Sequence, residues 1–254
     1  MWCGVLAFGL NWLVYVPSAL ARTEHYYDLT GGLTYLSVTG LAVVLSHPLD
    51  LRSTLVVGMV SIWAIRLAGF LFVRVKRVGK DIRFDSVKTK PSTFLVWWTL
   101  QALWVLTTMA AALAIVTGGE RISMSWLGWI GFGVWLFGFT VEVVADAQKS
   151  SFKNDLVNQG QFIRTGLWSW SRHPNYFGEI VLWTGVAIMA IPVLTGWQYA
   201  TLISPVFVSF LLMKMSGVPL LERKADERWG GQEEYEAYKA ATPVLIPRPP
   251  RVEK

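Results

Sequence analysis

Ten consecutive residues, 171–180, place several polar side chains at the start of an apolar segment: Ser-Arg-His-Pro-Asn-Tyr-Phe-Gly-Glu-Ile. Proline is tolerated in the first turn of a helix, so we predict that Pro174 is the first helical residue and that His173 caps the helix. The free backbone amides of such a helix start, together with its positive dipole end, attract anions. With Arg172 beside them, they predict a site for a phosphate or another anion.

Two pairs of polar residues stand four positions apart, so each pair would share one face of a helix: Asn175 with Glu179, and Glu142 with Asp146. Lysines follow the second pair at three- and four-residue steps, the last of them Lys153. One interpretation is a solvated helix end with favourable charge pairing. The other is a polar cleft, in which carboxylates accept hydrogen bonds from ribose or amide groups and lysines face phosphates, or in which one carboxylate acts as a general acid.

The segment 22–32 crowds proton donors into a short turn that we expect between two apolar segments. Glu24 and Asp28 are one helical turn apart, and Tyr27 and Tyr35 are near them in the chain. These four residues are candidates for gripping a substrate carbonyl. The alternative is an interfacial loop with the aromatic residues that such loops often carry.

Two further groups of charged residues leave a structural and a functional interpretation open. Arg66 stands within an apolar segment, where it either contributes to a site or extends its long side chain to the lipid headgroups. In the tail, most charges of residues 222–238 are expected to face solvent. Glu222, Arg223 and Tyr235 are candidates for folding back over a cofactor as a lid.

The composition is that of a polytopic membrane protein: 53% of the 254 residues are hydrophobic, 16% are charged, and 14 are tryptophan. A single cysteine excludes an internal disulfide and a cysteine-based metal site. The three histidines are far apart, so we expect no metal centre. The net charge of +6 fits basic residues that anchor against anionic lipid. We therefore expect a lipid bilayer as partner and no nucleic acid.

We predict an all-α integral membrane protein, a bundle of seven transmembrane helices that forms one membrane domain over residues 1–254. Lysine and arginine concentrate in cytoplasmic loops, and with the N-terminus outside and the C-terminus cytoplasmic most of the 23 basic residues fall on the cytoplasmic side. The predicted spans cover about 1–21, 32–47, 51–73, 93–116, 125–145, 177–194 and 197–214.

The chain resembles the steroid 5-alpha-reductase-like membrane proteins, in particular their bacterial branch (DUF1295-type). Three stretches carry the resemblance: 171–179, 23–35 (Thr-Glu-His-Tyr-Tyr-Asp-Leu-Thr-Gly-Gly-Leu-Thr-Tyr) and the Glu-x-x-x-Asp at 142–146. The resemblance implies a multi-pass integral membrane reductase, located in the inner membrane if the protein is bacterial. In such an enzyme NADPH enters from the cytosol and delivers hydride to the beta-carbon of a lipophilic alpha,beta-unsaturated ketone, such as a 3-oxo-4-ene steroid.

The resemblance also implies roles for individual residues. Glu24 matches the family's acid near the carbonyl, with Asp28 as the alternative, and Tyr27 or Tyr35 would replace a tyrosine for which this chain has Trp63. Arg83 is a candidate for binding phosphates, and Glu142 stands where the animal members carry asparagine. The implied cofactor contacts are Asp146, Lys153, Arg172, Asn175, Tyr176 and Glu179.

Two other classes of protein compete with the reductase. An S-adenosylmethionine-dependent methyltransferase of the isoprenylcysteine or phospholipid type shares Arg-His-Pro-x-Tyr-x-Gly. Its cofactor carries no phosphate, so such an enzyme has less need of many basic residues at the entrance of its site. A non-catalytic lipid-binding or assembly protein would leave the polar clusters unexplained. The sequence therefore favours the NADPH-dependent reductase.

Overall fold

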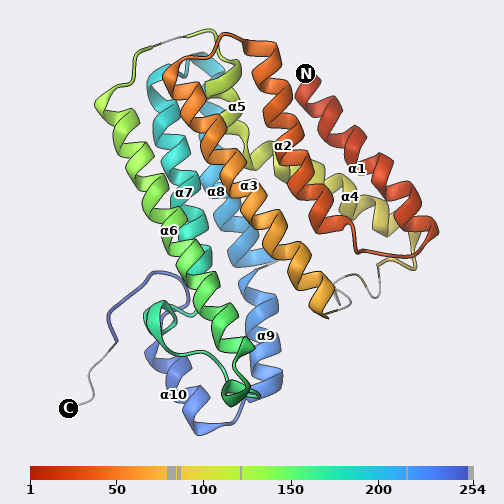
Figure 1. Ribbon diagram of the computed structural model, residues 1–254, viewed down its shortest axis with the longest axis vertical. Helices are drawn as coiled ribbons and strands as arrows, with labels where there is room; N and C mark the ends of the chain where they lie inside the picture. Colours follow the sequence, from red (N-terminus) through yellow and green to blue (C-terminus); the bar gives the residue numbers. More distant parts are fainter. Residues whose placement is uncertain (79–83, 85–86, 121, 216, 251–254) are drawn as a thin grey trace. The chain divides into compact units, whose positions relative to one another are not determined.

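The computed structural model of the protein describes residues 1–78, 84, 87–120, 122–215 and 217–250, with side chains described outside 70–78. Within these ranges every regular element is helical and there is no strand, which confirms the predicted all-α class (Figure 1). The chain divides into two compact units: Met1–Gly128 with Met189–Ser204, and Trp129–Ile188 with Pro205–Lys254.

The first unit is a bundle of apolar helices. Its α-helices are α1 (Trp2–Leu20), α2 (Tyr27–Ser46), α3 (Leu51–Val78), α4 (Pro91–Thr108) and α5 (Ala110–Thr117). Figure 1 shows α2 between α1 and α3, and α2 packs against both. The interior includes the fully buried Trp63 and Trp98, whereas α1 exposes Trp12, Leu13 and Leu20. Apolar side chains on both faces of a helix are typical of contact with lipid.

Among the residues that the structure describes, six helices are long and apolar enough to cross a membrane, and α4 and α5 give a seventh span if this pair, bent by 57°, is counted as one. These numbers are compatible with a multi-pass membrane protein and with the seven predicted spans. The predicted orientation of the termini and the single membrane domain stay predictions.

The predicted start of the second span was wrong. The second span begins at Tyr27 instead of residue 32, so Tyr27 and Asp28 lie in the first turn of α2 and not in a loop. A carboxylate in a first turn stabilises the helix through its dipole, which accounts for the earlier start. The predicted span 197–214 lies within the candidate span Gly196–Trp229, where it consists of a 3-10 helix at Gly196–Leu202, α8 (Ile203–Phe210) and a π-helical turn at Leu211–Met215.

The second unit contains most of α6 (Trp126–Asn154), then α7 (Pro174–Ala190), α9 (Val218–Trp229) and α10 (Glu233–Ala241). Glycines let the backbones of α6 and α7 approach each other. A methyl group on Gly178 would lie 2.6 Å from the Glu142 nitrogen, and one on Gly185 would lie 2.5 Å from the Trp135 nitrogen. Small residues at such contacts are typical of helix pairs in membranes. These glycine contacts hold the start of α7 close to the polar end of α6.

Candidate functional site

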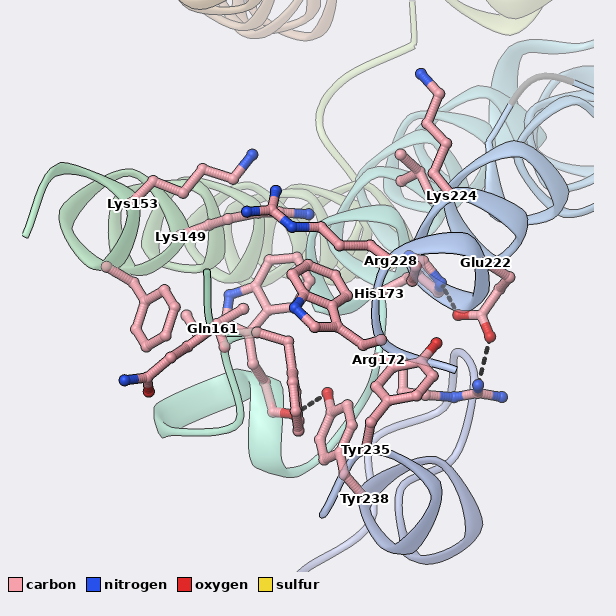
Figure 2. A pocket seen from close by; sticks show the side chains of 17 residues that line it. Lys149, Lys153, Gln161, Arg172, His173, Glu222, Lys224, Arg228, Tyr235 and Tyr238 are labelled. Carbon is pink, nitrogen blue, oxygen red and sulfur yellow. Dashed lines mark hydrogen bonds and ion pairs between the residues drawn. The ribbon is translucent and has the colours of Figure 1, made fainter. Parts of the chain in front are cut away.

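A cavity of about 300 Å³ lies in the second unit, at the polar end of α6 and α9 (Figure 2). Its walls come from α6, from the 155–173 loop, and from α9 and α10. The lining residues are Lys149, Phe152, Lys153, Gln161, Phe162, Ile163, Trp168, Arg172, His173, Leu221, Glu222, Lys224, Ala225, Arg228, Trp229, Tyr235 and Tyr238.

Trp168 forms a fixed aromatic wall of this cavity. Its indole nitrogen donates a hydrogen bond to the Ala145 carbonyl on α6 at 3.0 Å, and its own carbonyl accepts one from the Tyr238 hydroxyl at 2.7 Å. The Lys149 ammonium lies 4.3 Å from the centre of the indole ring. Because Trp168 is held from α6 and from α10, it can present a rigid ring face to a ligand.

Further aromatic rings cluster around Phe162. Its ring centre lies 5.3 Å from that of Tyr235, 5.4 Å from that of Tyr238 and 5.8 Å from that of Trp229. The Trp229 indole also donates to the Gly160 carbonyl at 2.6 Å. These contacts attach the 155–173 loop to α9 and α10, so three separate parts of the chain share one aromatic cluster.

At another edge of the cavity, Glu222 holds two residues of the Arg-His-Pro motif. One carboxylate oxygen accepts a hydrogen bond from Arg172 Nη1, and the other lies 2.7 Å from His173 Nε2. His173 is only 4% exposed, and burial lowers its pKa below the ordinary 6.5 although Glu222 opposes this shift. His173 is therefore neutral at pH 7, and Glu222 is an acceptor for both side chains.

The charge of the lining is strongly positive. Five cations line the cavity, namely Lys149, Lys153, Arg172, Lys224 and Arg228, against the single carboxylate of Glu222. Figure 2 shows Arg228 extending from α9 toward α6, which carries Lys149 and Lys153. An excess of positive charge around one space attracts an anion. Phosphate groups are the anions that such clusters commonly bind.

The start of α7 lies where the sequence predicts it, at Pro174. The Asn175 amide donates to the Asp146 carboxylate on α6 at 3.2 Å, and its own oxygen, which is buried, accepts no hydrogen bond from the described residues. Glu142, one turn earlier on α6, is 2% exposed. Tyr176 stacks on His173, with ring centres 5.6 Å apart.

Five of the predicted cofactor-binding residues line the cavity: Lys153, Arg172, His173, Glu222 and Tyr235. Glu142, Asp146, Asn175, Tyr176 and Glu179 belong to α6 and α7 of the same unit but are not among its lining residues. Arg223 is 70% exposed at its side chain and faces Glu227 at 3.8 Å, outside the cavity. Arg83 lies outside the described residues.

The predicted catalytic residues and Arg66 belong to the first unit. Glu24 is buried and accepts a hydrogen bond from the Lys88 ammonium at 2.9 Å. The Tyr27 hydroxyl donates to the Trp97 carbonyl at 2.9 Å, and Tyr35 packs edge-on against Trp63. Asp28 and Arg66 are half-buried.

Sequence reasoning missed Lys224 and Arg228 as lining residues, although helical periodicity contains a signal for them. Leu221, Ala225 and Trp229 recur every four residues on α9 and all line the cavity, so they mark its inward face. Lys224 and Arg228 flank this stripe, while Arg223 falls on the other side. Nothing in the local sequence predicts the contributions of Phe162 and Trp168, because loop residues carry no such period.

Comparison with known proteins gives partial similarities. The chain is 34% identical over 89 residues to an uncharacterized protein of Schizosaccharomyces pombe, 26% identical over 129 residues to the probable O-methyltransferase ustE of Ustilaginoidea virens, and 30% identical over 118 residues to the 3-oxo-5-alpha-steroid 4-dehydrogenase 1 of Macaca fascicularis. These matches cover 28, 48 and 46% of this chain. They cover only 26, 45 and 40% of the relatives' own lengths.

No solved structure matches the chain with significance. One family match extends through nearly all of the first unit and through the cavity of the second, over residues 14–242, and this family is described as a protein of unknown function, DUF1295. Because the match covers far more than half of the sequence, the chain belongs to the DUF1295 family.

Proposed function

We propose that the protein is a membrane reductase that uses NADPH to saturate the C=C bond of a lipophilic alpha,beta-unsaturated ketone, such as a 3-oxo-4-ene steroid. The cavity of the second unit would hold the nucleotide part of the cofactor. Partial similarity to a 3-oxo-5-alpha-steroid 4-dehydrogenase supports this reaction class, and the apolar helices support a substrate that arrives from the bilayer.

The observation that carries the proposal is the combination of charge and aromatic rings in one cavity. Five cations suit a ligand with several phosphate charges, and rings such as Trp168 and Phe162 suit a purine, which stacks on aromatic faces. S-adenosylmethionine has no phosphate, and its sulfonium would be repelled by the same cations. The donor set therefore fits NADPH better than it fits the methyl donor.

When bound, NADPH would supply the hydride for the beta-carbon, and a proton added to the alpha-carbon of the resulting enolate would complete the saturation of the double bond. The chain must then stabilise the negative charge that develops on the carbonyl oxygen, which a hydrogen-bond donor does most effectively. We keep Glu24, Asp28, Tyr27 and Tyr35 as proposed donors. Glu24 accepts a hydrogen bond from the Lys88 ammonium here, and a carboxyl group donates a hydrogen bond only when it is protonated, so Glu24 would act as the donor in its protonated form.

A second candidate is an S-adenosylmethionine-dependent membrane methyltransferase, which the match to a probable O-methyltransferase favours. In that reading Arg172 would bind the carboxylate of the methyl donor, and its aromatic neighbours would bind the adenine. The charge of the remaining four cations would then have no partner in the ligand, which is why we place this function second.

Titration of the detergent-purified protein with NADPH, NADH and S-adenosylmethionine separates the two candidates. We expect NADPH to bind most tightly, and we expect its binding to weaken with added salt because phosphate contacts are screened. If the protein binds S-adenosylmethionine and neither nicotinamide nucleotide, the cavity belongs to a methyltransferase. If NADPH binds, oxidation of NADPH in the presence of 3-oxo-4-ene steroids and simpler enones tests the reaction itself.

A further inference from the structure

His173 stands out in the cavity because one atom of its ring has no hydrogen-bond partner. The residue is 4% exposed, and its Nδ1 atom is buried without a partner among the described residues. Its Nε2 atom lies 2.7 Å from Glu222 Oε1. Tyr176 stacks on one face of the ring and restricts its rotation, with an angle of 11° between the two planes.

The partner of Nε2 determines the tautomer of this ring. Glu222 also accepts a hydrogen bond from the Arg172 guanidinium, which keeps its carboxylate ionised. An ionised carboxylate only accepts hydrogen bonds, so Nε2 must carry the proton and donate it. In a neutral imidazole the other nitrogen is then an acceptor. The arrangement therefore leaves Nδ1 with a lone pair to which no group of the described residues donates.

Most of the charged side chains that line this cavity can only donate hydrogen bonds. Among its described lining residues, five side chains are cations, which only donate hydrogen bonds, and the oxygens of Glu222 are taken up by Arg172 and His173. A buried acceptor without a donor is unfavourable, so such groups are normally satisfied by water or by a ligand. His173 thus lines a ligand-sized space, and its buried Nδ1 atom has unused hydrogen-bonding capacity.

We infer that Glu222 is a positioning residue that fixes His173 with Nδ1 as an acceptor, and that Nδ1 accepts a hydrogen bond from a hydroxyl or amino group of a bound nucleotide. The ligand half of this inference rests on the proposed nucleotide function of the cavity. The cations would bind phosphate oxygens. His173 would accept a hydrogen bond from an uncharged group of the nucleotide, either a ribose hydroxyl or the adenine amino group.

Nitrogen NMR of protein labelled with ¹⁵N-histidine tests the tautomer without any ligand. The chain has three histidines, and the His173→Gln variant identifies the signals of this one. We expect a protonated Nε2 and an unprotonated Nδ1. In Glu222→Leu the two tautomers should mix, in Glu222→Gln the original one should return at least in part, and in Glu227→Leu, a change of an exposed neighbour on α9, it should persist. A protonated Nδ1 in the unchanged protein would overturn the inference.

Adenosine 2′,5′-bisphosphate is the probe for the ligand half. We expect its binding to shift the Nδ1 signal as that atom gains a donor, and we expect His173→Leu to weaken binding about tenfold. An analogue without the 3′-hydroxyl and one with hypoxanthine in place of adenine distinguish the two donors. On the unchanged protein, the analogue that lacks the bonded group should bind about tenfold more weakly than adenosine 2′,5′-bisphosphate. On His173→Leu, the two compounds should bind equally well.

The outcomes separate this inference from the proposed function. Tight binding of the probe with an unmoved Nδ1 signal would reject the role of His173 and leave the nucleotide site intact. Absence of any binding, with the expected tautomer present, would reject the ligand half together with the proposed function while the positioning role of Glu222 stands.

Discussion

Gly178 on α7 lies so close to Glu142 on α6 that a methyl group on the glycine would come within 2.6 Å of the glutamate's backbone nitrogen and within 2.6 Å of the Gly138 carbonyl oxygen. Both of these neighbours are backbone atoms, which cannot turn aside as a side chain can. The distance between the two helices, and with it the position of the Arg-His-Pro motif relative to α6, therefore depends on the missing side chain.

We expect Gly178→Ala to destabilise the second unit by about 1–3 kcal/mol, the usual cost of forcing extra atoms into a packed contact. Thermal unfolding in detergent measures the effect. Gly133→Ala is the matched control on α6, because a methyl group there would have no neighbour within 4 Å. Equal stability of the two variants would contradict the close approach.

Replacing Arg228 with methionine removes a cation from the cavity but keeps a long apolar stem. We expect nucleotide affinity to fall by about 1 kcal/mol, or about fivefold, since the side chain is exposed and its charge is screened by solvent. Lys224→Met should act in the same direction. Calorimetric titration with NADPH at low ionic strength gives the dissociation constants.

Arg223→Met provides the control for these two variants, because it removes the same charge from the same helix outside the cavity. Affinity should stay within twofold of the unchanged protein. A loss as large as that in Arg228→Met would mean that only the overall charge matters and would remove the support for a defined site.

The ion pair between Glu24 and Lys88 predicts a non-additive pair of mutations. Glu24→Gln removes the carboxylate to which the Lys88 ammonium donates, in a position where only 22% of the lysine side chain is exposed. We expect a loss of about 1–3 kcal/mol in stability for this variant, and a smaller loss when Lys88→Met is added, since the double variant removes both charges of the pair. Additive losses in a double-mutant cycle would show that the pair is not coupled.

The same variant tests catalysis. If Glu24 acts near the substrate carbonyl, Glu24→Gln should slow the reduction of an enone while NADPH binds normally to the second unit. If the variant turns over at the original rate, Glu24 is not the donor, and Asp28, Tyr27 or Tyr35 takes its place in the proposal.

The low pKa of His173 predicts how stability depends on pH. Burial keeps this ring neutral against the opposing pull of Glu222, with Lys149 and Arg172 adding smaller effects in the same direction as burial. In the unfolded chain the ring takes up a proton near pH 6.5, which the folded protein does not. As the pH falls below about 6.5, His173 should therefore reduce the free energy of unfolding by up to about 1.4 kcal/mol per pH unit.

The contribution of one histidine is isolated by comparison with His173→Gln, which cannot titrate in this range. Thermal midpoints measured between pH 7.5 and 5 should converge for the two proteins if His173 carries the effect. Parallel curves would show that its pKa is the same in the folded and the unfolded chain.

The membrane helices were predictable because the signal is local: an apolar run of sufficient length defines a span wherever it packs. The first turn of α7 was predictable for the same reason, since Pro174 limits where a helix can start. The bend between α4 and α5 was not predictable, because position 109 is a methionine and not a proline or a glycine. An apolar sequence of this length is equally compatible with a straight helix and a bent one.

The cavity was predictable only in part. Arg172, His173 and Lys153 stand in short motifs whose residue types suggest anion binding. Trp168 and Phe162 join them through contacts with Tyr238, about 70 residues further along the chain, and such pairings depend on tertiary packing that a single sequence does not display.

The end of the chain is tied to the motif that precedes α7. The Arg172 amide donates to the Pro243 carbonyl at 2.9 Å, the Ser171 hydroxyl to the Leu245 carbonyl at 2.8 Å, and the Arg248 amide to the Trp170 carbonyl at 2.9 Å. Residues 243–248 therefore run antiparallel to residues 170–172 and are hydrogen-bonded to them. Anyone who shortens this protein for purification, or fuses a fluorescent reporter to it, should keep the chain through Arg248, because a cut at residue 242 would release the backbone on which Arg172 and His173 are mounted.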